Sequence, residues 1–442
     1  MKPSVFVGFL VSTGVLSTPA MALEYNLGVG NTTLHTSNVA RTADDEVNDW
    51  VQIPTARLIA SHDTGALQLD ADYRFERRIY DQDVFDDRNR LTGRANLLWD
   101  ALPGRIQFFG TNTRTEATIN SIQQDVEDNR QLVRTSSVGP RLLLNPRASD
   151  QFVLEYRYAV VREDDANFFG AGIIDTDSDR NRVTASYQLG ISQNRSLSLQ
   201  ASREEVDFDD PLTPDLDIDN VSLSYQSKSG SVELIASGGF SDITRTQGLS
   251  RVDGFVGNLS IDWALSGSRN LIITARRNLN DQSQDLQLGT GRFGQGTVVD
   301  NSGLNDVFEE DSVGLVYRSR VGRNTFGFGY RYQTQDFATQ NRDEEEHRVN
   351  ARFERRHTPT VSSNISAQFT RREFLFNGVE DDFFSASGNI EWQATRRLAF
   401  ALGANYTDRD SSNTNGFSFE EISGSLSINF DLLSKKIAKQ RN

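Results

Sequence analysis

The sequence predicts an all-β protein, namely a transmembrane antiparallel up-and-down β-barrel of about 20 strands. Strand-length segments recur in which apolar and polar residues alternate, as in Leu67–Phe75 (LQLDADYRF). Successive side chains of a strand point to opposite faces, so each such segment has one apolar and one charged side. These segments are joined alternately by short turns and by long connections. A single half-buried strand of a soluble protein would look the same, but the whole series is typical of a membrane barrel.

The first 22 residues predict a secretory signal peptide. They contain Lys2, an apolar run over Val5–Leu16 and an A-x-A cleavage site at Ala20–Ala22. A membrane-anchoring first helix is the alternative, but the run is short and small residues follow it. Beyond it, no apolar run approaches the roughly 18–20 residues that a spanning helix requires. We therefore expect export, with residues 23–430 forming the barrel and residues 431–442 a basic periplasmic tail.

The composition fits a wall one strand thick. The chain has 61 acidic and 46 basic residues, which argues against nucleic acid as a partner, and no cysteine, so no disulfide stabilises it. Hydrophobic residues make up only 37 % of its 442 residues, and the large aliphatic ones stand singly. A soluble all-β chain of this length would show an apolar surplus to fill its core. We therefore expect the protein in the bacterial outer membrane.

Twenty segments share the alternation, and an even number returns both chain ends to one side of the membrane. One weak pair could be loop, so 18 strands is the alternative. In order, the expected strands are Leu23–Asn31, Trp50–His62, Leu67–Phe75, Arg88–Asp100, Arg105–Thr113, Leu132–Leu144, Gln151–Val161, Asp179–Gly190, Arg195–Val206, Asn220–Gln226, Val232–Ser241, Phe255–Ala264, Asn270–Asn278, Asp311–Arg320, Thr325–Gln335, His347–Arg356, Val361–Arg372, Phe383–Gln393, Leu398–Asp408 and Ser418–Phe430.

The connections fall into two classes. Short Gly/Pro/Asn turns such as Asp63–Gly65 match tight hairpins and would face the periplasm. The other class would form extracellular loops and is long or acidic: Ala43–Asp49, Asp81–Asp87, Glu163–Asp179, Glu204–Asp219, Asp281–Asp311, Asp343–Glu346 and Glu380–Asp382. These carboxylates are either a solvated surface or a means of bridging to lipopolysaccharide through divalent cations. No ordered metal site and no cofactor is predicted.

Three of the four tryptophans predict an aromatic girdle. Trp99, Trp263 and Trp392 each occupy the apolar parity of a strand, at the last outward position before a short turn. Aromatic rings concentrate at the membrane interfaces of barrels. We therefore expect all three to face lipid near the periplasmic rim.

The residues on the polar side of each strand predict a water-filled lumen, because the free-energy cost of burying so many charges in a dry core would be prohibitive. Its arginines should therefore contribute little to stability. The residues expected to line the pore are Asp70, Asp72, Arg74, Arg94, Glu155, Arg157, Arg182, Arg276, Arg318, Arg331, Arg352, Glu354, Arg372 and Glu391. The Gly-rich segment Leu286–Val307 is either an ordinary outer loop or an inward constriction.

Catalysis has little support in the sequence. The four histidines lie near strand ends without a serine or aspartate at a recognisable spacing, and G-x-S-x-G, P-loop and H-E-x-x-H motifs are absent. No catalytic residue is predicted, and we expect a protein that is not an enzyme.

Two resemblances add expectations. The closing strand alternates apolar residues and ends at Phe430, which resembles the strand that the barrel-assembly machinery recognises. The chain also resembles the β-barrel porin family of exopolysaccharide gene clusters. The resemblance lies in the segments NLGVGNTTLHTSNV, WVQIPTARLIAS and VGPRLLLNP. That resemblance implies an outer-membrane channel that secretes a polysaccharide, sometimes beside a periplasmic export partner. A general or solute-specific diffusion porin is the alternative, and an adhesion barrel is a third.

Overall fold

The structure is a computed structural model that describes residues 23–118, 126–163, 177–211, 213–246, 251–281, 297–298, 306–338, 343–413 and 417–435. The predicted signal peptide and most of Leu286–Val307 therefore lie outside the described residues. One turn of 3-10 helix, η1 (Glu127–Asn129), is the only helix in the described part of the chain. No helix in that part is long and apolar enough to cross a membrane.

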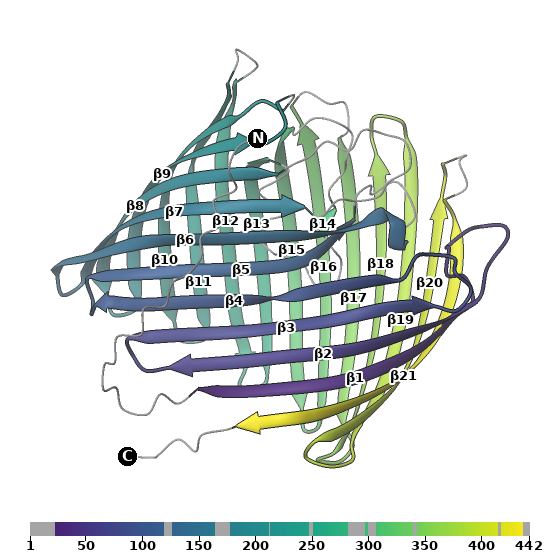
Figure 1. Cartoon of the computed structure of the whole chain (residues 1–442). Coiled ribbons are helices and arrows are strands. Elements are labelled where there is room, and N and C mark those ends of the chain that lie inside the picture. Colours follow the sequence, from purple (N-terminus) through teal and green to yellow (C-terminus); the bar gives the residue numbers. More distant parts are fainter. Residues whose placement is uncertain are drawn as a thin grey trace, which may run out of the picture.

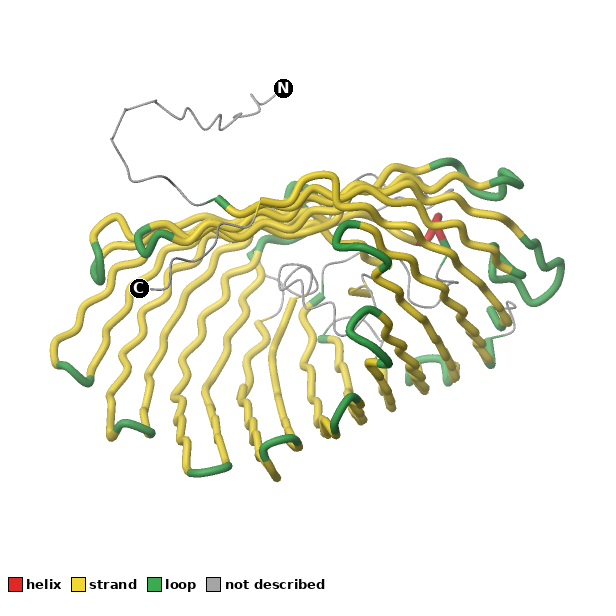
Figure 2. Tube along the Cα trace, turned by 90° about the horizontal axis from the view of Figure 1, so that it is seen from below, coloured by secondary structure: helices red, strands yellow, loops and turns green. Residues whose placement is uncertain are grey.

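Twenty long antiparallel strands form a closed barrel, as the sequence predicts. Each strand pairs with its neighbours in the chain, and β1 pairs with both β2 and β21, which closes the ring (Figures 1 and 2). Strands of the near and far walls cross one another in Figure 1, as expected when strands tilt about 35–45° from the barrel axis. The wall strands are β1 (Glu24–Thr36), β2 (Asp49–Asp63), β3 (Leu67–Tyr80), β4 (Arg88–Leu102), β5 (Ile106–Thr118), β6 (Arg130–Arg147), β7 (Asp150–Glu163), β8 (Ser178–Ser192), β9 (Arg195–Phe208), β10 (Leu216–Ser229), β11 (Val232–Arg245), β12 (Arg251–Ser266), β13 (Arg269–Asp281), β15 (Val307–Val321), β16 (Asn324–Phe337), β17 (Glu344–Arg356), β18 (Val361–Phe374), β19 (Val379–Gln393), β20 (Leu398–Ser411) and β21 (Phe419–Lys435).

Short turns join the strands at one end of the barrel and longer connections join them at the other. Gly65, Gly104, Gly230 and Gly322 occupy short turns with φ between 55° and 77°, a region that side chains disfavour. Tight hairpins of this kind face the periplasm in outer-membrane barrels. We call the opposite end the loop end.

Several predicted boundaries are wrong at the loop end, where the strands run further than expected. Glu380–Asp382 and Glu344–Glu346 were expected in loops but belong to β19 and β17, and β15 begins at Val307 rather than Asp311. The strand ladder continues there although both faces carry charged residues, so the alternation that marks a strand in the sequence is lost. At the other end, β21 continues past Phe430 and pairs with β1 as far as Lys435, so the predicted tail begins within a strand.

The two faces of the wall differ as the alternation requires. Arg180 of β8 and Asp281 of β13 form an ion pair although four strands separate them along the wall, so their contact runs through the interior. The register then assigns every strand an inner face, which includes Arg180, and an outer face. The outer face carries exposed apolar residues such as Phe328, Ile365 and Leu402. Packed apolar clusters occur only near the loop end in the described part of the chain.

Candidate functional site

Cross-strand pairing puts all fourteen predicted pore-lining residues on the inner face. The assignment passes from strand to strand: Asp72 lies opposite Arg94, Arg157 opposite Arg182, and Arg352 opposite Ser366. Five of the fourteen are exposed arginines, namely Arg74, Arg94, Arg276, Arg318 and Arg352, whereas the exposed carboxylates are Asp70 and Glu391. The exposed charge of this set is therefore positive.

The other arginines of the set are held in ion pairs. Arg157 bonds Glu155 at 2.9 Å, and that carboxylate also accepts from Arg141 at 2.6 Å. Arg182 pairs with Glu204. The pair of Arg157 and Glu155 is half-buried, so its charges stay partly in water, whereas Glu204 is buried with only 3 % of its side chain exposed.

Two arginines contradict the expectation that the inner-face arginines contribute little to stability. Arg331 bonds Glu310 at 3.1 Å, and the Glu310 side chain is only 2 % exposed. Arg372 bonds Glu346 at 2.9 Å, and Arg348 bonds the same carboxylate at 2.7 Å. A carboxylate buried to this extent requires its cations, because an unpaired buried charge is expensive. These arginines therefore hold the loop end together.

The three predicted girdle tryptophans lie on the outer face beside short turns. Trp99, Trp263 and Trp392 are 49 %, 46 % and 51 % exposed. Trp99 stacks on Phe108 and Trp392 stacks on Phe400, with ring centroids 5.5 Å apart in both pairs. Their contact with lipid stays a prediction. The fourth tryptophan, Trp50, lies at the loop end against His35.

One strand tip leaves the wall at the boundary between β4 and β5. The ladder of these strands stops at Gly93 and Arg114, although both strands continue. Above that point Glu116, whose parity is that of the outer face, pairs with Arg90 on the inner face of β4. The tip of β5 and β6 is therefore tucked behind β4, on the interior side.

The short helix η1 fixes this first tuck. Glu127 is buried and accepts from Tyr80 at 3.0 Å and from Arg78 at 3.2 Å, and it also pairs with Arg90. Burial opposes ionisation of this carboxyl, but the charges of Arg90 and Arg78 outweigh it, so the pKa of Glu127 lies below its ordinary range. Glu127 is thus an ionised latch on the inner face of β3 and β4.

A second tuck occurs at the boundary between β12 and β13. Their ladder ends at Gly257 and Arg277, whereas β12 extends to Arg251 and β13 to Asp281. Leu279 and Val307, which have outer-face parity, pack against Val252 and Val256 on the inner face of β12. The tip of β13 and β15 therefore lies inside the barrel and covers the inner face of its neighbours.

Apolar packing and two buried ion pairs hold the second tuck. The packed cluster comprises Val206, Phe208, Leu216, Ile218, Ile243, Leu279 and Val307. Asp281 pairs with Arg180 of β8, and Asp306 pairs with Arg245 of β11. Both aspartates are fully buried, so the two pairs are shielded from water and salt.

The two tucks approach one another across the interior. Thr297–Val298 forms the short strand β14, which pairs in parallel with Ala117–Thr118 at the tip of β5 (Figures 1 and 2). Residues of the connection between β13 and β15 thus contact the far side of the ring. The tip of β5 and the connection that contains β14 therefore narrow the lumen at its loop end.

Sequence reasoning missed the residues that make these tucks. No role in packing or pairing was predicted for Arg180, Arg245, Glu127, Asp281 or Asp306. One signal was available, because Val206, Ile218 and Ile243 are apolar residues at inner-face positions of consecutive strands. Apolar residues on a wet face indicate that something packs over them.

The described residues contain no group of three or more histidine, aspartate or glutamate side chains placed to hold a metal ion. His347 hydrogen-bonds Tyr330 at 3.0 Å and Glu345 at 3.1 Å on the outer face. Several acidic residues of the loop end are paired with arginines, as in the bonds of Arg371 to Asp382 and of Arg203 to Asp217.

No family model matches the sequence, and no curated protein matches it. Solved structures with a similar fold include the FrpB iron transporter from Neisseria meningitidis, with 9 % identity, a TM-score of 0.50 and coverage of 92 % of this chain and 81 % of that chain. They also include OccK2 (OpdF) from Pseudomonas aeruginosa, with 12 % identity, a TM-score of 0.42 and coverage of 93 % and 98 %. A BenF-like porin from Pseudomonas fluorescens Pf-5 has 12 % identity, a TM-score of 0.43 and coverage of 93 % and 99 %.

At these identities the similarity extends to the fold alone. The closed wall, its exposed apolar outer face and its charged inner face decide where such a chain resides, because only a closed barrel or a helix satisfies every backbone group in lipid. The protein is an outer-membrane β-barrel. The expected membership of the exopolysaccharide-cluster family gains no support, since no family model matches.

Proposed function

We propose that this barrel is a diffusion channel that lets small hydrophilic solutes cross the outer membrane, with a preference for anions. The observation that carries the proposal is the combination of a charged inner face with the narrowing of the loop end by two tucked strand tips. A lumen lined by arginine, serine and amide residues provides hydrogen-bond partners along its length without a single tight site. Barrels of this size have an interior wide enough for water unless something occupies it.

The anion preference follows from the exposed charges. Arg74, Arg94, Arg276, Arg318 and Arg352 project into the lumen with only Asp70 and Glu391 as exposed opposites in that set. Fixed charges inside a narrow passage raise the local concentration of oppositely charged ions. Although the whole chain carries a net charge of −15, much of its acidic surplus lies at the loop end.

Secretion of an exopolysaccharide is the competing proposal, and the hydrogen-bonding inner face also supports it. The narrowing favours small solutes, because a polymer conduit requires a clear bore along its whole length. Neither proposal includes a catalytic step.

The test is reconstitution in planar bilayers. We expect single channels whose reversal potential in a salt gradient shows chloride to be more permeant than potassium. The double variant R74Q/R94Q should lower this preference by about twofold, whereas R355Q, on the outer face, should leave it unchanged. Two results together would favour the export proposal instead. The protein would show no conductance in the bilayer, and a deletion strain would lose surface polysaccharide while it takes up solutes normally.

A further inference from the structure

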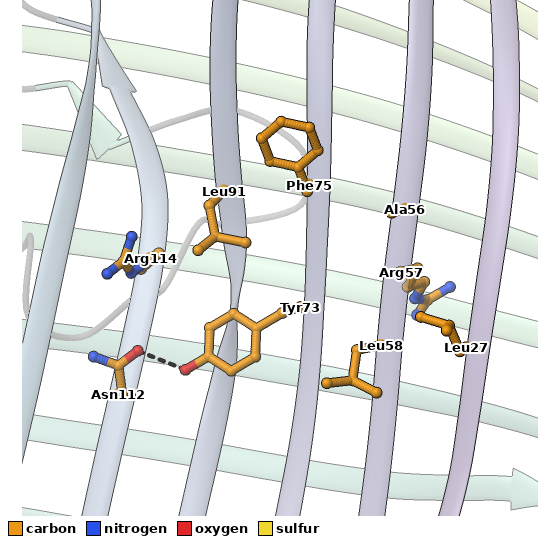
Figure 3. Close-up of a pocket in the computed structure, with 9 residues that line it drawn as sticks. All are labelled: Leu27, Ala56, Arg57, Leu58, Tyr73, Phe75, Leu91, Asn112 and Arg114. Carbon is orange, nitrogen blue, oxygen red and sulfur yellow. Dashed lines mark hydrogen bonds between the residues drawn. The ribbon is translucent and has the colours of Figure 1, made fainter.

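A groove runs over the outer face of β1 to β5, on the side of the wall away from the lumen. It encloses a volume of ≈ 410 Å³, and its walls include Leu27, Leu58, Tyr73, Phe75 and Leu91 (Figure 3). These side chains belong to the lipid-facing parity. The groove is therefore a place where an acyl chain can lie against the wall.

Gly93 leaves room for this groove. It lies between Tyr73 and Arg114 in the cross-strand row, where any other residue would place a side chain. Its φ is 142°, and an added Cβ would come within 2.9 Å of Tyr73 Cδ1. The Tyr73 hydroxyl instead reaches past Gly93 and donates to Asn112 Oδ1 at 2.5 Å, as Figure 3 shows.

The side of the groove formed by β5 and β6 carries an unusual pair of cations. Arg114 lines the groove, and Arg134 lies directly opposite it on β6. Neither guanidinium makes an ion pair or hydrogen bond with any residue that the structure describes. Like charges directly opposite each other destabilise a sheet, and an arginine facing lipid costs up to about 2–4 kcal/mol. The pair therefore requires a compensating anion.

Other outer-face arginines of the loop end have such a partner within the chain. Arg162 bonds Asp179 at 2.7 Å, Arg251 bonds Asp242 at 2.7 Å, and Arg371 bonds Asp382 at 2.5 Å. In a chain with 61 acidic residues, two adjacent arginines without a carboxylate stand out. No carboxylate of the described residues pairs with them, so an anion from outside the chain can take that place.

We propose that the groove and the Arg114–Arg134 pair bind a phosphorylated glycolipid of the outer leaflet, with an acyl chain in the groove and a phosphate between the two guanidinium groups. The arrangement suits such a lipid, because the cations lie at one side of the apolar groove, next to β6, as phosphates lie at one end of the acyl chains. Planar guanidinium groups match phosphate oxygens and bind them through paired hydrogen bonds. This site does not depend on the proposed channel function.

The test is native mass spectrometry of the purified barrel with bisphosphorylated lipid A and with its dephosphorylated form. The wild type should retain the phosphorylated lipid at least about tenfold better, and R114Q/R134Q should abolish that difference. R251Q is the matched control, because it removes an outer-face arginine of the same end that already has a partner; it should retain lipid as the wild type does. A56F, which fills the groove but keeps both arginines, should weaken retention of both lipids.

Three outcomes overturn the proposal: equal retention by wild type and R114Q/R134Q, equal retention of the two lipids by wild type, or A56F behaving as wild type. A wild-type dimer free of lipid would also overturn it, because a second copy would then cover the groove. Heat-modifiable migration in electrophoresis verifies folding of each variant. If the double variant does not fold, R134Q alone, at an exposed position, decides the matter by the same comparison.

Discussion

At the scale of single residues, the inner-face arginines divide into two groups with different roles. Arg352 is 63 % exposed at its side chain and lies 4.0 Å from Glu354, so water compensates most of its charge. Arg331 is directed at a carboxylate that water hardly reaches. Two arginines on the same face of the wall can therefore contribute very differently to the stability of the barrel.

We predict that Arg331→Ala destabilises the barrel by about 3 kcal/mol, because it leaves Glu310 as a buried charge without this cation. Arg352→Ala should leave stability within about 0.5 kcal/mol of wild type and alter only ion selectivity. Urea unfolding in lipid vesicles measures the first effect and reversal potentials the second. Equal stability of the two variants would show that water enters beside Glu310.

Glu127 provides a prediction about pH. Its folded pKa lies below the unfolded value of 4.5, so it stabilises the first tuck above pH 4.5 and loses that effect as the pH falls through the lowered folded pKa. The groups facing it are Arg78, Arg90 and Tyr80.

We therefore expect acid to release the tip of β5 and β6. Hydrogen exchange of residues 115–118 and 130–133 should accelerate as the pH falls below 4.5, after correction for intrinsic exchange rates. Glu127→Gln should give fast exchange already at neutral pH. Protection in wild type that does not change with pH would contradict the latch.

At the scale of elements, the tucks show that strands can leave the wall without opening the barrel. The tip of β13 and β15 gives up the ladder with β12 above Gly257 and Arg277. In exchange it buries Leu279 and Val307 and forms two shielded ion pairs. Apolar burial of about 1.5–3 kcal/mol per large side chain is comparable with the hydrogen bonds that are lost.

The second tuck predicts a change in conductance. In Asp281→Asn/Asp306→Asn the tip loses its ion pairs with Arg180 and Arg245, which weakens its attachment to the interior. Single-channel conductance should rise by about twofold or more, because the tip would return toward the wall. Asp253→Asn, at an outer-face position of β12, is the matched control and should conduct as wild type; an unchanged conductance in the double variant would mean that the tuck lies outside the ion path.

At the scale of the whole molecule, we predict that the three girdle tryptophans fix the height of the barrel in the bilayer. Trp99, Trp263 and Trp392 are expected at the periplasmic interface, and Trp50 lies at the loop end. Lipids brominated near the headgroup should quench their fluorescence more than lipids brominated near the chain end, because indole rings prefer the interface. Single-tryptophan variants provide the measurement, and stronger quenching at the bilayer centre would contradict the predicted height.

Sequence alone determined the class of fold, the number of strands, the division into short turns and long connections and, outside the two tucked tips, the face of the wall on which the strand residues lie. These follow from a period of two repeated in every strand, which a membrane barrel imposes because one side of each strand meets lipid. The confirmed elements, such as β3 and β20, are those in which apolar and polar residues alternate without interruption. Boundaries at the loop end failed because polar residues there occupy both faces.

Only the tertiary structure decided which charges are buried, where the wall folds inward and where a lipid groove lies. Arg180 and Asp281 are 101 positions apart in the chain and meet only because β13 tucks behind β12. Gly93 shapes the groove through neighbours on β3 and β5, and nothing in its local sequence indicates this. Alternation records the side of the wall that a residue faces, whereas contacts between distant strands depend on the curvature and closure of the whole ring.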